Sequence, residues 1–281
     1  MLQKFFKYHG AGNDFLLADN RDGRLFLSED QVKFLCNRHT GFGADGVILL
    51  ESGTDSDFRM VFFNPDGSSG MMCGNGGRCI VSFAADLGVV SGKFPVVFEA
   101  SDGLHTAVIQ SGSKNLPRMV RLKMKDVEGV DIFPDGKSCF LDTGTRHLVK
   151  IVEGVKDYPV LEEGRTLRHD KRFAPLGTNV DFVEAADDAD GTLLKVRTFE
   201  KGVEDETLAC GTGIVASAIS AYSLQIPWDV CPEGGVSYRV RAAIADLSVD
   251  FKPSGSGADL VAADVWLTGP TAFIGTVECM L

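Results

Sequence analysis

Two segments of this chain begin alike and lie about half the chain length apart. Each has a cysteine followed by Gly-x-Gly: Cys73-Gly74-Asn75-Gly76 and Cys210-Gly211-Thr212-Gly213. The stretches that follow, residues 74–87 and 211–224, are apolar on nearly all sides, so the sequence predicts two buried helices. A repeat of this size indicates two similar halves, each built around one of these helices.

Further matches extend the repeat beyond the cysteines. The segment FFNPDG places Asn64 shortly before Cys73, and RTFEKG places Glu200 shortly before Cys210. A third echo sets the segment 12–15, GNDF, beside the segment 178–182, TNVDF. Most other segments are short β-branched or aromatic runs closed by turn residues, which is typical of strands.

The fold class expected is therefore α+β, with two similar halves, each a curved, mostly antiparallel sheet around a buried central helix. Residues 238–251 alternate like a half-buried antiparallel strand pair, and residues 28–38 begin with a serine cap and predict a further helix. The division between the halves is expected near Asn115, giving residues 1–116 and 117–269.

Composition narrows the class of protein. The chain has 39 acidic and 28 basic residues, a net charge of −11, which argues against a nucleic-acid partner. No apolar run approaches the roughly 18 residues of a membrane span, so no membrane partner is expected. The cysteine count is seven, an odd number, and the N-terminal residues lack a signal-peptide pattern. A reducing, cytoplasmic location is therefore expected.

The repeated motif indicates a particular chemistry. A cysteine just before a helix lies in the positive field of the helix N-terminus, which stabilises a thiolate. The free N–H groups there also bind anions such as a carboxylate. Two such cysteines on opposite faces of one α-carbon suit stereoinversion, because one thiolate removes the proton and the other thiol returns one. This chemistry needs no cofactor.

Two other interpretations explain fewer of these features. A cysteine hydrolase with His147 as base leaves the second copy of the motif unexplained. A duplicated structural turn is the alternative without function. Cys36-x2-His39 and Cys73-x5-Cys79 do not continue into a four-ligand zinc pattern, so no metal site is predicted.

At these residues the sequence resembles the diaminopimelate epimerases, within the wider family of cofactor-independent two-cysteine racemases. The resemblance rests on YHGAGNDF, CNRHTGFGADGVI, FFNPDGSSGMMCGNGGRC, GTNVDFV, RTFEKGVEDETLACGTG and LTGP, which span residues 8–270. It implies two halves of one fold, with a final strand, about residues 270–281, crossing back to the first half. It also implies interconversion of LL- and meso-diaminopimelate on the lysine and cell-wall pathway, and it favours a homodimer.

The resemblance also implies roles for single residues. Cys73 and Cys210 match the acid/base pair, Glu200 the acidic residue that supports the second cysteine, and His147 the histidine near the first. We expect His147 to support Cys73 by hydrogen bonding. The residues that match the substrate-binding set are Asn13, Asn64, Gly74, Asn75, Asn179, Gly211 and Thr212.

Three departures from the family pattern fall around the distal end of the substrate. Thr145 stands where the family has a substrate-binding Asn, and Lys201 stands where it has a carboxylate-gripping Arg. Lysine is a point charge and not a planar fork, so this exchange is not neutral. The loop GVEDET is one residue longer than usual, and Arg146 adds a charge that could compensate for Lys201. A racemase or isomerase of another amino acid, and a non-catalytic amino-acid-binding paralogue, therefore stay open as alternatives.

Overall fold

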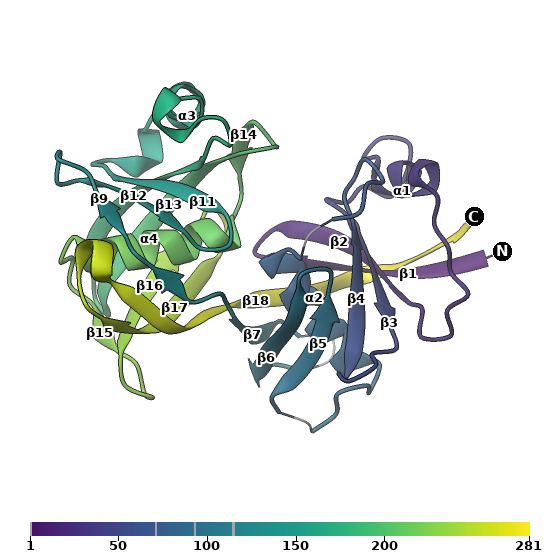
Figure 1. Cartoon of the computed structure of the whole chain (residues 1–281). Helices are drawn as coiled ribbons and strands as arrows, with labels where there is room; N and C mark the ends of the chain where they lie inside the picture. Colours follow the sequence, from purple (N-terminus) through teal and green to yellow (C-terminus); the bar gives the residue numbers. More distant parts are fainter. Residues whose placement is uncertain (1, 71, 93, 114–115) are drawn as a thin grey trace. The chain divides into compact units, whose positions relative to one another are not determined.

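The computed structural model describes residues 2–70, 72–92, 94–113 and 116–281. It divides into two compact units (Figure 1): Met1–Leu122 with Gly269–Leu281, and Lys123–Thr268. Asn115, near which the division was expected, lies outside the described residues. The observed change of unit comes at Leu122 and Lys123, and the chain returns to the first unit at Gly269.

The strands of the first unit pair into a closed ring. In order around the ring they are β1 (Leu2–Gly10), β2 (Asn13–Asp19), β3 (Val47–Glu51), β4 (Phe58–Phe63), β5 (Val96–Ala100), β6 (Gly103–Ser111), β7 (Arg118–Lys123) and the last part of β18 (Val261–Met280). The pairs β2–β3 and β4–β5 are parallel, and the other pairs are antiparallel. Because β18 pairs with β1 as far as Leu2 and Met280, the two termini lie side by side (Figure 1).

Helix α2 (Gly74–Asp86) runs through this ring and packs against β1, β2, β3 and β6. Residues 75–84 are all buried, as expected for a helix that is apolar on nearly all sides. Along the surrounding strands, buried and less buried side chains alternate, and the buried ones form the core around the helix. In β7, for example, Arg118, Val120 and Leu122 are buried while the residues between them are half-buried.

The second unit repeats this plan. Its strands are β8 (Val127–Glu128), β9 (Asp131–Ile132), β10 (Ser138–Asp142), β11 (Arg146–Ile151), β12 (Asn179–Asp188), β13 (Gly191–Glu200), β16 (Val236–Arg241), β17 (Asp246–Ser254) and the first part of β18. Pairing runs from β9 through β10, β11, β12, β13, β16 and β17 to β18, which also pairs with β8. Helix α4 (Gly211–Ser223) lies among these strands (Figure 1) and is buried over residues 213–221.

The two units correspond strand for strand. β1 to β4 correspond to β10 to β13, α2 corresponds to α4, and β5 and β6 correspond to β16 and β17. The parallel pairs recur in the same places, β2–β3 with β11–β12 and β4–β5 with β13–β16. The α+β class, the mostly antiparallel sheets and the buried central helices are confirmed. Local sequence patterns did not predict that the sheet of the first unit closes on itself.

The expected correspondence between residues 12–15 and residues 178–182 of the two halves is wrong. Asn13 begins β2 and Asn179 begins β12, but the counterpart of β2 is β11. Gly12 precedes Asn13 and Gly144 precedes Thr145 at the starts of these two strands, so the residue that corresponds to Asn13 is Thr145. The other echo holds, because Asn64 directly follows β4 and Glu200 ends β13, its counterpart.

The remaining helices cover the outside of the units. α1 (Glu29–Cys36) begins with the predicted cap: the Ser28 hydroxyl accepts from the Gln31 N–H, and the Gln31 side chain accepts from the Ser28 N–H. α3 (Val160–Arg168) was not predicted. Short elements complete the chain: β14 (Asp205–Thr207), β15 (Asp229–Val230) and the 3-10 turns Val155–Asp157, Lys171–Phe173 and Gly257–Asp259. No helix in the described part of the chain is long and apolar enough to span a membrane.

Candidate active site

Cys73 directly precedes α2 and has extended backbone angles, φ −102° and ψ 127°. Its carbonyl accepts the first helical hydrogen bond, from the Gly77 N–H at 2.7 Å, and no side chain caps the helix. The N–H groups of the first turn are therefore not used by the helix itself. The thiol of Cys73 is half-buried at this positive helix end.

Two amides connect Cys73 to the strands around it. The Cys73 thiol donates to Asn13 Oδ1 at 3.7 Å, and the Asn75 amide donates to the same oxygen at 3.3 Å. Asn13 Nδ2 donates to Asp45 Oδ2 at 2.7 Å. Since a carboxylate only accepts, Asp45 fixes the orientation of the Asn13 amide and turns its oxygen toward Cys73.

Behind these amides lies a charged cluster. The Asp14 carboxylate contacts Lys7 Nζ at 2.8 Å and Arg38 Nη2 at 2.7 Å, and Arg38 also contacts Asp45 at 2.6 Å. Burial acts to raise the pKa of Asp14, but the hydrogen bonds from Arg38 and Lys7 outweigh it and hold that pKa below its usual value. The carboxylates near Asn13 thus have basic partners of their own.

Asn64 lies in the turn after β4 and keeps its contacts within that turn. Its side chain donates to Ser68 Oγ at 3.0 Å, and its carbonyl accepts from the Gly67 N–H. Both of these partners belong to the turn itself. Its role as a substrate contact therefore stays a prediction.

Cys210 occupies the corresponding place before α4, and it is more deeply buried than Cys73. Burial raises the pKa of the Cys210 thiol well above its usual value, and the negative charges of Glu200 and Asp181 raise it further. Hydrogen bonds from the Thr212 hydroxyl and the Gly213 N–H act in the opposite direction. This environment favours the protonated thiol.

Beneath the first turn of α4 lies a buried His–Asp pair. His147 Nδ1 is 2.7 Å from Asp181 Oδ2, and both side chains are fully buried. Because the carboxylate only accepts, Nδ1 carries the proton in this pair. The other carboxylate oxygen accepts from the Thr198 hydroxyl at 2.6 Å. Gly213 makes room for the pair, since a Cβ there would lie 2.3 Å from Asp181 Oδ1.

From His147 the network continues to Cys210. His147 Nε2 is 2.9 Å from the Thr145 hydroxyl and 3.0 Å from the Thr212 hydroxyl. The two hydroxyls are 3.0 Å apart, and Thr212 Oγ1 is 3.4 Å from Cys210 Sγ. These contacts connect the ring of His147 to Cys210 through Thr212. The expected hydrogen-bonding support of Cys73 by His147 stays a prediction.

The residues expected at the distal end of the substrate are arranged around Asn179. Its amide donates to the Arg146 carbonyl at 3.1 Å, and its oxygen accepts from the Lys201 N–H at 2.8 Å. The Lys201 residue itself is exposed. Arg146 lies over the Phe140 ring at 5.0 Å and donates to the Phe173 carbonyl, so its guanidinium is already engaged. This gives no support to the idea that Arg146 compensates for Lys201.

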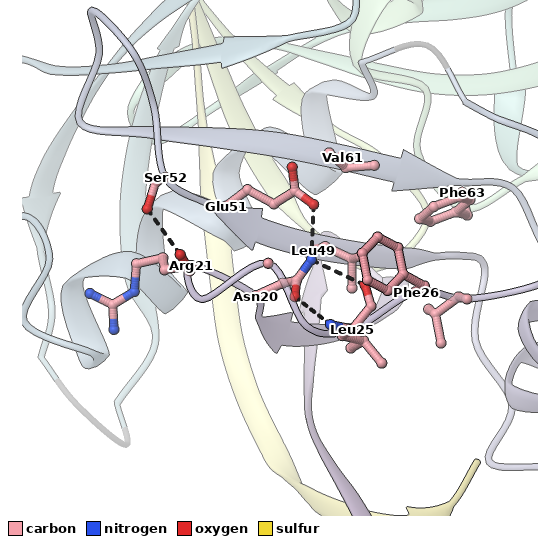
Figure 2. Close-up of a pocket in the computed structure, with 11 residues that line it drawn as sticks. Asn20, Arg21, Leu25, Phe26, Leu49, Glu51, Ser52, Val61 and Phe63 are labelled. Atoms are coloured by element: carbon pink, nitrogen blue, oxygen red, sulfur yellow. Dashed lines mark hydrogen bonds between the residues drawn. The ribbon is translucent and has the colours of Figure 1, made fainter. Parts of the chain in front are cut away.

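A cavity of about 390 Å³ lies in the first unit (Figure 2). It is lined by the segment 20–27 and by residues of β3 and β4, among them Leu49, Val61 and Phe63. Asn20 holds this segment by donating to Glu51 Oε1 at 2.9 Å and accepting from the Leu25 N–H at 2.8 Å. None of the expected site residues lines the cavity.

Metal ligands are not gathered anywhere in the ranges described: no three His, Cys, Asp or Glu side chains there are placed to hold an ion together.

Comparison with known proteins agrees with the motif analysis. The family model described as diaminopimelate epimerase matches residues 5–124 and 139–227. A diaminopimelate epimerase of Flavobacterium psychrophilum is 37% identical over 96% of this chain and 98% of its own length. One from Chlorobaculum tepidum is 46% identical over 76% of this chain and 82% of its own length. The chain belongs to the diaminopimelate epimerase family.

Solved structures confirm the fold of this family member. A phenazine biosynthesis protein of the PhzF family from Bacillus anthracis superposes over the full length of both chains, with a TM-score of 0.74 and 14% identity. At this identity the match concerns the fold alone.

The sequence motifs did not single out three further residues that lie close to the expected site residues. Asp181 accepts from His147, Thr198 donates to Asp181, and Arg78 lies buried in the first half of α2. Two of them carried a visible signal. Asp181 is a charge between the apolar residues Val180 and Phe182, and Arg78 is a charge in a helix that is otherwise apolar on nearly all sides.

Proposed function

We propose that this chain is a cofactor-independent diaminopimelate epimerase that interconverts the LL and meso forms by inverting one α-carbon. The observation that carries the proposal is the pair Cys73 and Cys210, each at the N-terminus of a buried helix in corresponding places of two like units. Membership of the family supports the choice of substrate. This reaction belongs to the lysine and cell-wall pathway.

The reaction moves one proton off the α-carbon and another onto it. One cysteine, as thiolate, accepts the α-proton while the C–H electron pair becomes part of an enediolate-like carbanion. The other cysteine, as thiol, gives its proton to the opposite face of that carbon. After one turnover the protonation states of the two cysteines are exchanged, and the reverse reaction uses the exchanged pair. The proposal requires one α-carbon to reach both thiols, one on each face.

The helix starts supply the electrostatic part. The N–H groups of Gly74 and Asn75, and those of Gly211 and Thr212, would bind the α-carboxylate. As proton removal begins, negative charge grows on that carboxylate, and fixed donors stabilise it more in the transition state than in the ground state. This makes a pyridoxal or metal electron sink unnecessary.

The other polar residues take supporting roles. Asn13, Asn64, Asn179 and Thr145 contact the remainder of the substrate, and Lys201 attracts its distal carboxylate. His147 supports Cys210 through a hydrogen bond to Thr212. Glu200 acts on Cys210 through its negative charge. We further infer a cytoplasmic homodimer with a small amino acid as its only substrate partner.

One alternative follows from a specific observation. The Thr145 hydroxyl is engaged by both His147 and Thr212, and Lys201 replaces the planar fork of an arginine. These changes favour a shorter or differently charged amino acid as substrate. A panel of amino acids assayed for α-proton exchange would separate this alternative from the main proposal.

The test is conversion of LL-diaminopimelate by the reduced enzyme, followed by chromatography that separates the stereoisomers. Formation of the meso isomer is expected with the native chain, and its loss with Cys73→Ser and with Cys210→Ser. Cys279→Ser is the matched control, since that half-buried thiol lies in β18 outside both motifs. A native chain that is folded and reduced but converts no diaminopimelate would overturn the proposal.

A further inference from the structure

Arg78 is the largest of the fully buried residues in the described part of the chain. It belongs to α2, five residues after Cys73, and a charge at such a place is costly unless it is compensated. Among the described residues it forms no ion pair with a carboxylate. Its hydrogen bonds go to the Asn75 side-chain oxygen at 2.7 Å and to the Gly74 carbonyl at 3.4 Å, and its Nε has no partner.

The charges that act on Arg78 come from sulfur. Burial lowers the pKa of Arg78, while thiolate charge on Cys79 and on Cys73 would raise it. Cys79 is an unsuitable counter-ion, because its own burial raises the pKa of that thiol far above the usual value. Of these two thiols, Cys73 is therefore the one able to compensate the buried guanidinium.

We propose that Arg78 is a positioning residue that holds Asn75 in place and supplies the buried positive charge that lets Cys73 ionise. The inference rests on the proposed function, in which Cys73 must exist both as thiol and as thiolate.

The amide network shows why such a charge is needed. Asn13 presents its oxygen to Cys73, and an acceptor favours the protonated thiol. Asp45 fixes this orientation without help from Arg78. Removing Arg78 therefore leaves the acceptor in place and takes away the opposing charge, so the expected direction of the effect is unambiguous.

Other ionisable groups around α2 within the first unit have partners of their own. On the strands packed against the helix, the pairs are Lys4 with Glu278, Lys7 and Arg38 with Asp14, Tyr8 with Asp86, Asp19 with Arg21, Glu51 with Asn20, and His105 with Asp102. His9 accepts from the Gly12 N–H, and Asp45 is held by Asn13 and Arg38.

The second unit has no equivalent of this charge. Val215 occupies the place in α4 that Arg78 occupies in α2, five residues after the cysteine. The charges that act on Cys210 are instead the carboxylates of Glu200 and Asp181. The inference therefore makes the two thiols unequal in the resting enzyme, with Cys73 as the thiolate and Cys210 as the thiol.

The test measures alkylation of Cys73 by iodoacetamide as a function of pH, in the full chain carrying Cys210→Ser, with mass spectrometry to locate the label. Arg78→Met is expected to raise the midpoint of the Cys73 profile by about one pH unit or more, which slows labelling at neutral pH about tenfold. Arg78→Lys keeps the charge and should restore most of the shift. Arg118→Met, which removes the cation paired with Asp86 at 2.6 Å, is the matched control and should leave the profile unmoved.

An unshifted Cys73 profile in folded Arg78→Met chain would overturn the inference. If that variant does not fold, the alkylation profile of Cys73 in Cys210→Ser is compared with the profile of Cys210 in Cys73→Ser. Cys73 is expected to react at lower pH than Cys210. Equal or reversed profiles would refute the inference. No substrate is present in these experiments. A failure of the epimerase proposal would therefore appear in the turnover assay and not here.

Discussion

The buried pair of His147 and Asp181 offers the sharpest test of how the second unit supports its thiol. Replacing Asp181 by asparagine keeps the shape of the side chain and removes its charge. The native carboxylate accepts from His147 Nδ1 at 2.7 Å and from the Thr198 hydroxyl at 2.6 Å, out of contact with solvent. The amide of asparagine must instead present an N–H to one of these two partners.

The magnitude follows from the two hydrogen bonds. Hydrogen bonds to a charged group contribute about 1.5–3 kcal/mol each, and neutral ones about 0.5–1.5 kcal/mol. Exchanging two of the first kind for two of the second costs about 2 kcal/mol in the free energy of unfolding. For a unit of this size that lowers the melting temperature by roughly 4–8 °C.

Turnover should fall as well. If the asparagine amide donates to Nδ1, the imidazole proton moves to Nε2, which then no longer accepts from the hydroxyls of Thr145 and Thr212. Since Thr212 contacts the Cys210 thiol at 3.4 Å, we expect kcat to fall about 5- to 30-fold, the equivalent of one hydrogen bond.

Thermal unfolding and initial-rate kinetics of Asp181→Asn measure both effects. Asp187→Asn, an exposed position on the same strand, is the control and should match the native chain. An Asp181→Asn enzyme with native melting temperature and native kcat would refute the reasoning, because the pair would then contribute neither to stability nor to the thiol.

Three further predictions concern single charges. Glu200→Gln removes a negative charge that raises the pKa of Cys210, so the pKa of that thiol should fall. Alkylation of Cys210 at neutral pH should then become faster, while epimerisation becomes slower. The control Glu204→Gln, at an exposed residue, should change neither rate. Lys201→Ala should raise KM for diaminopimelate with a smaller effect on kcat, because Lys201 attracts the distal carboxylate equally in the ground state and the transition state. A fall confined to kcat would contradict that role. Hydrogen bonds from Lys123, Lys252 and Trp266 hold the pKa of Asp264 well below its usual value. The contribution of Asp264 to the free energy of unfolding is therefore present above about pH 4 and is lost as the pH falls through the lowered pKa. Urea midpoints measured from pH 7 to pH 2 should therefore converge for the native chain and Asp264→Asn at the acid end, and a constant difference would be inconsistent with the pairing.

Much of the fold could be predicted because the strongest signals are local. α1 has a complete capping box, and α2 and α4 are long apolar segments that begin at glycine, so their starts and ends fall within a few residues of the prediction. α3 had no such signal. It follows Pro159 without a side-chain cap and buries only Val160 and Gly164. Closure of the sheet in the first unit depends on pairings between distant strands, such as β1 with β18, and no local pattern specifies these.

In the candidate site, too, residues of local motifs could be predicted, and contacts between distant segments could not. The cysteines and the residues beside them could be predicted because they belong to a contiguous motif that occurs twice. The partner of His147 could not be predicted from the motif alone, because Asp181 becomes its neighbour only when β11 and β12 pair in parallel, with His147 opposite Asn179. The charge of Arg78 was visible in the sequence, but its lack of a carboxylate partner appears only in the folded unit.

The central claim is that two thiols share one inversion, and proton NMR in D2O tests it most directly. The reduced enzyme is given LL-diaminopimelate, and the α-position of the first meso product is examined before the reaction approaches equilibrium. If Cys73 removes the proton and Cys210, exchanged with solvent, supplies another, the product carries deuterium at the inverted carbon. Product that retains the original proton, or inversion by either Cys73→Ser or Cys210→Ser at the native rate, would contradict the two-thiol account.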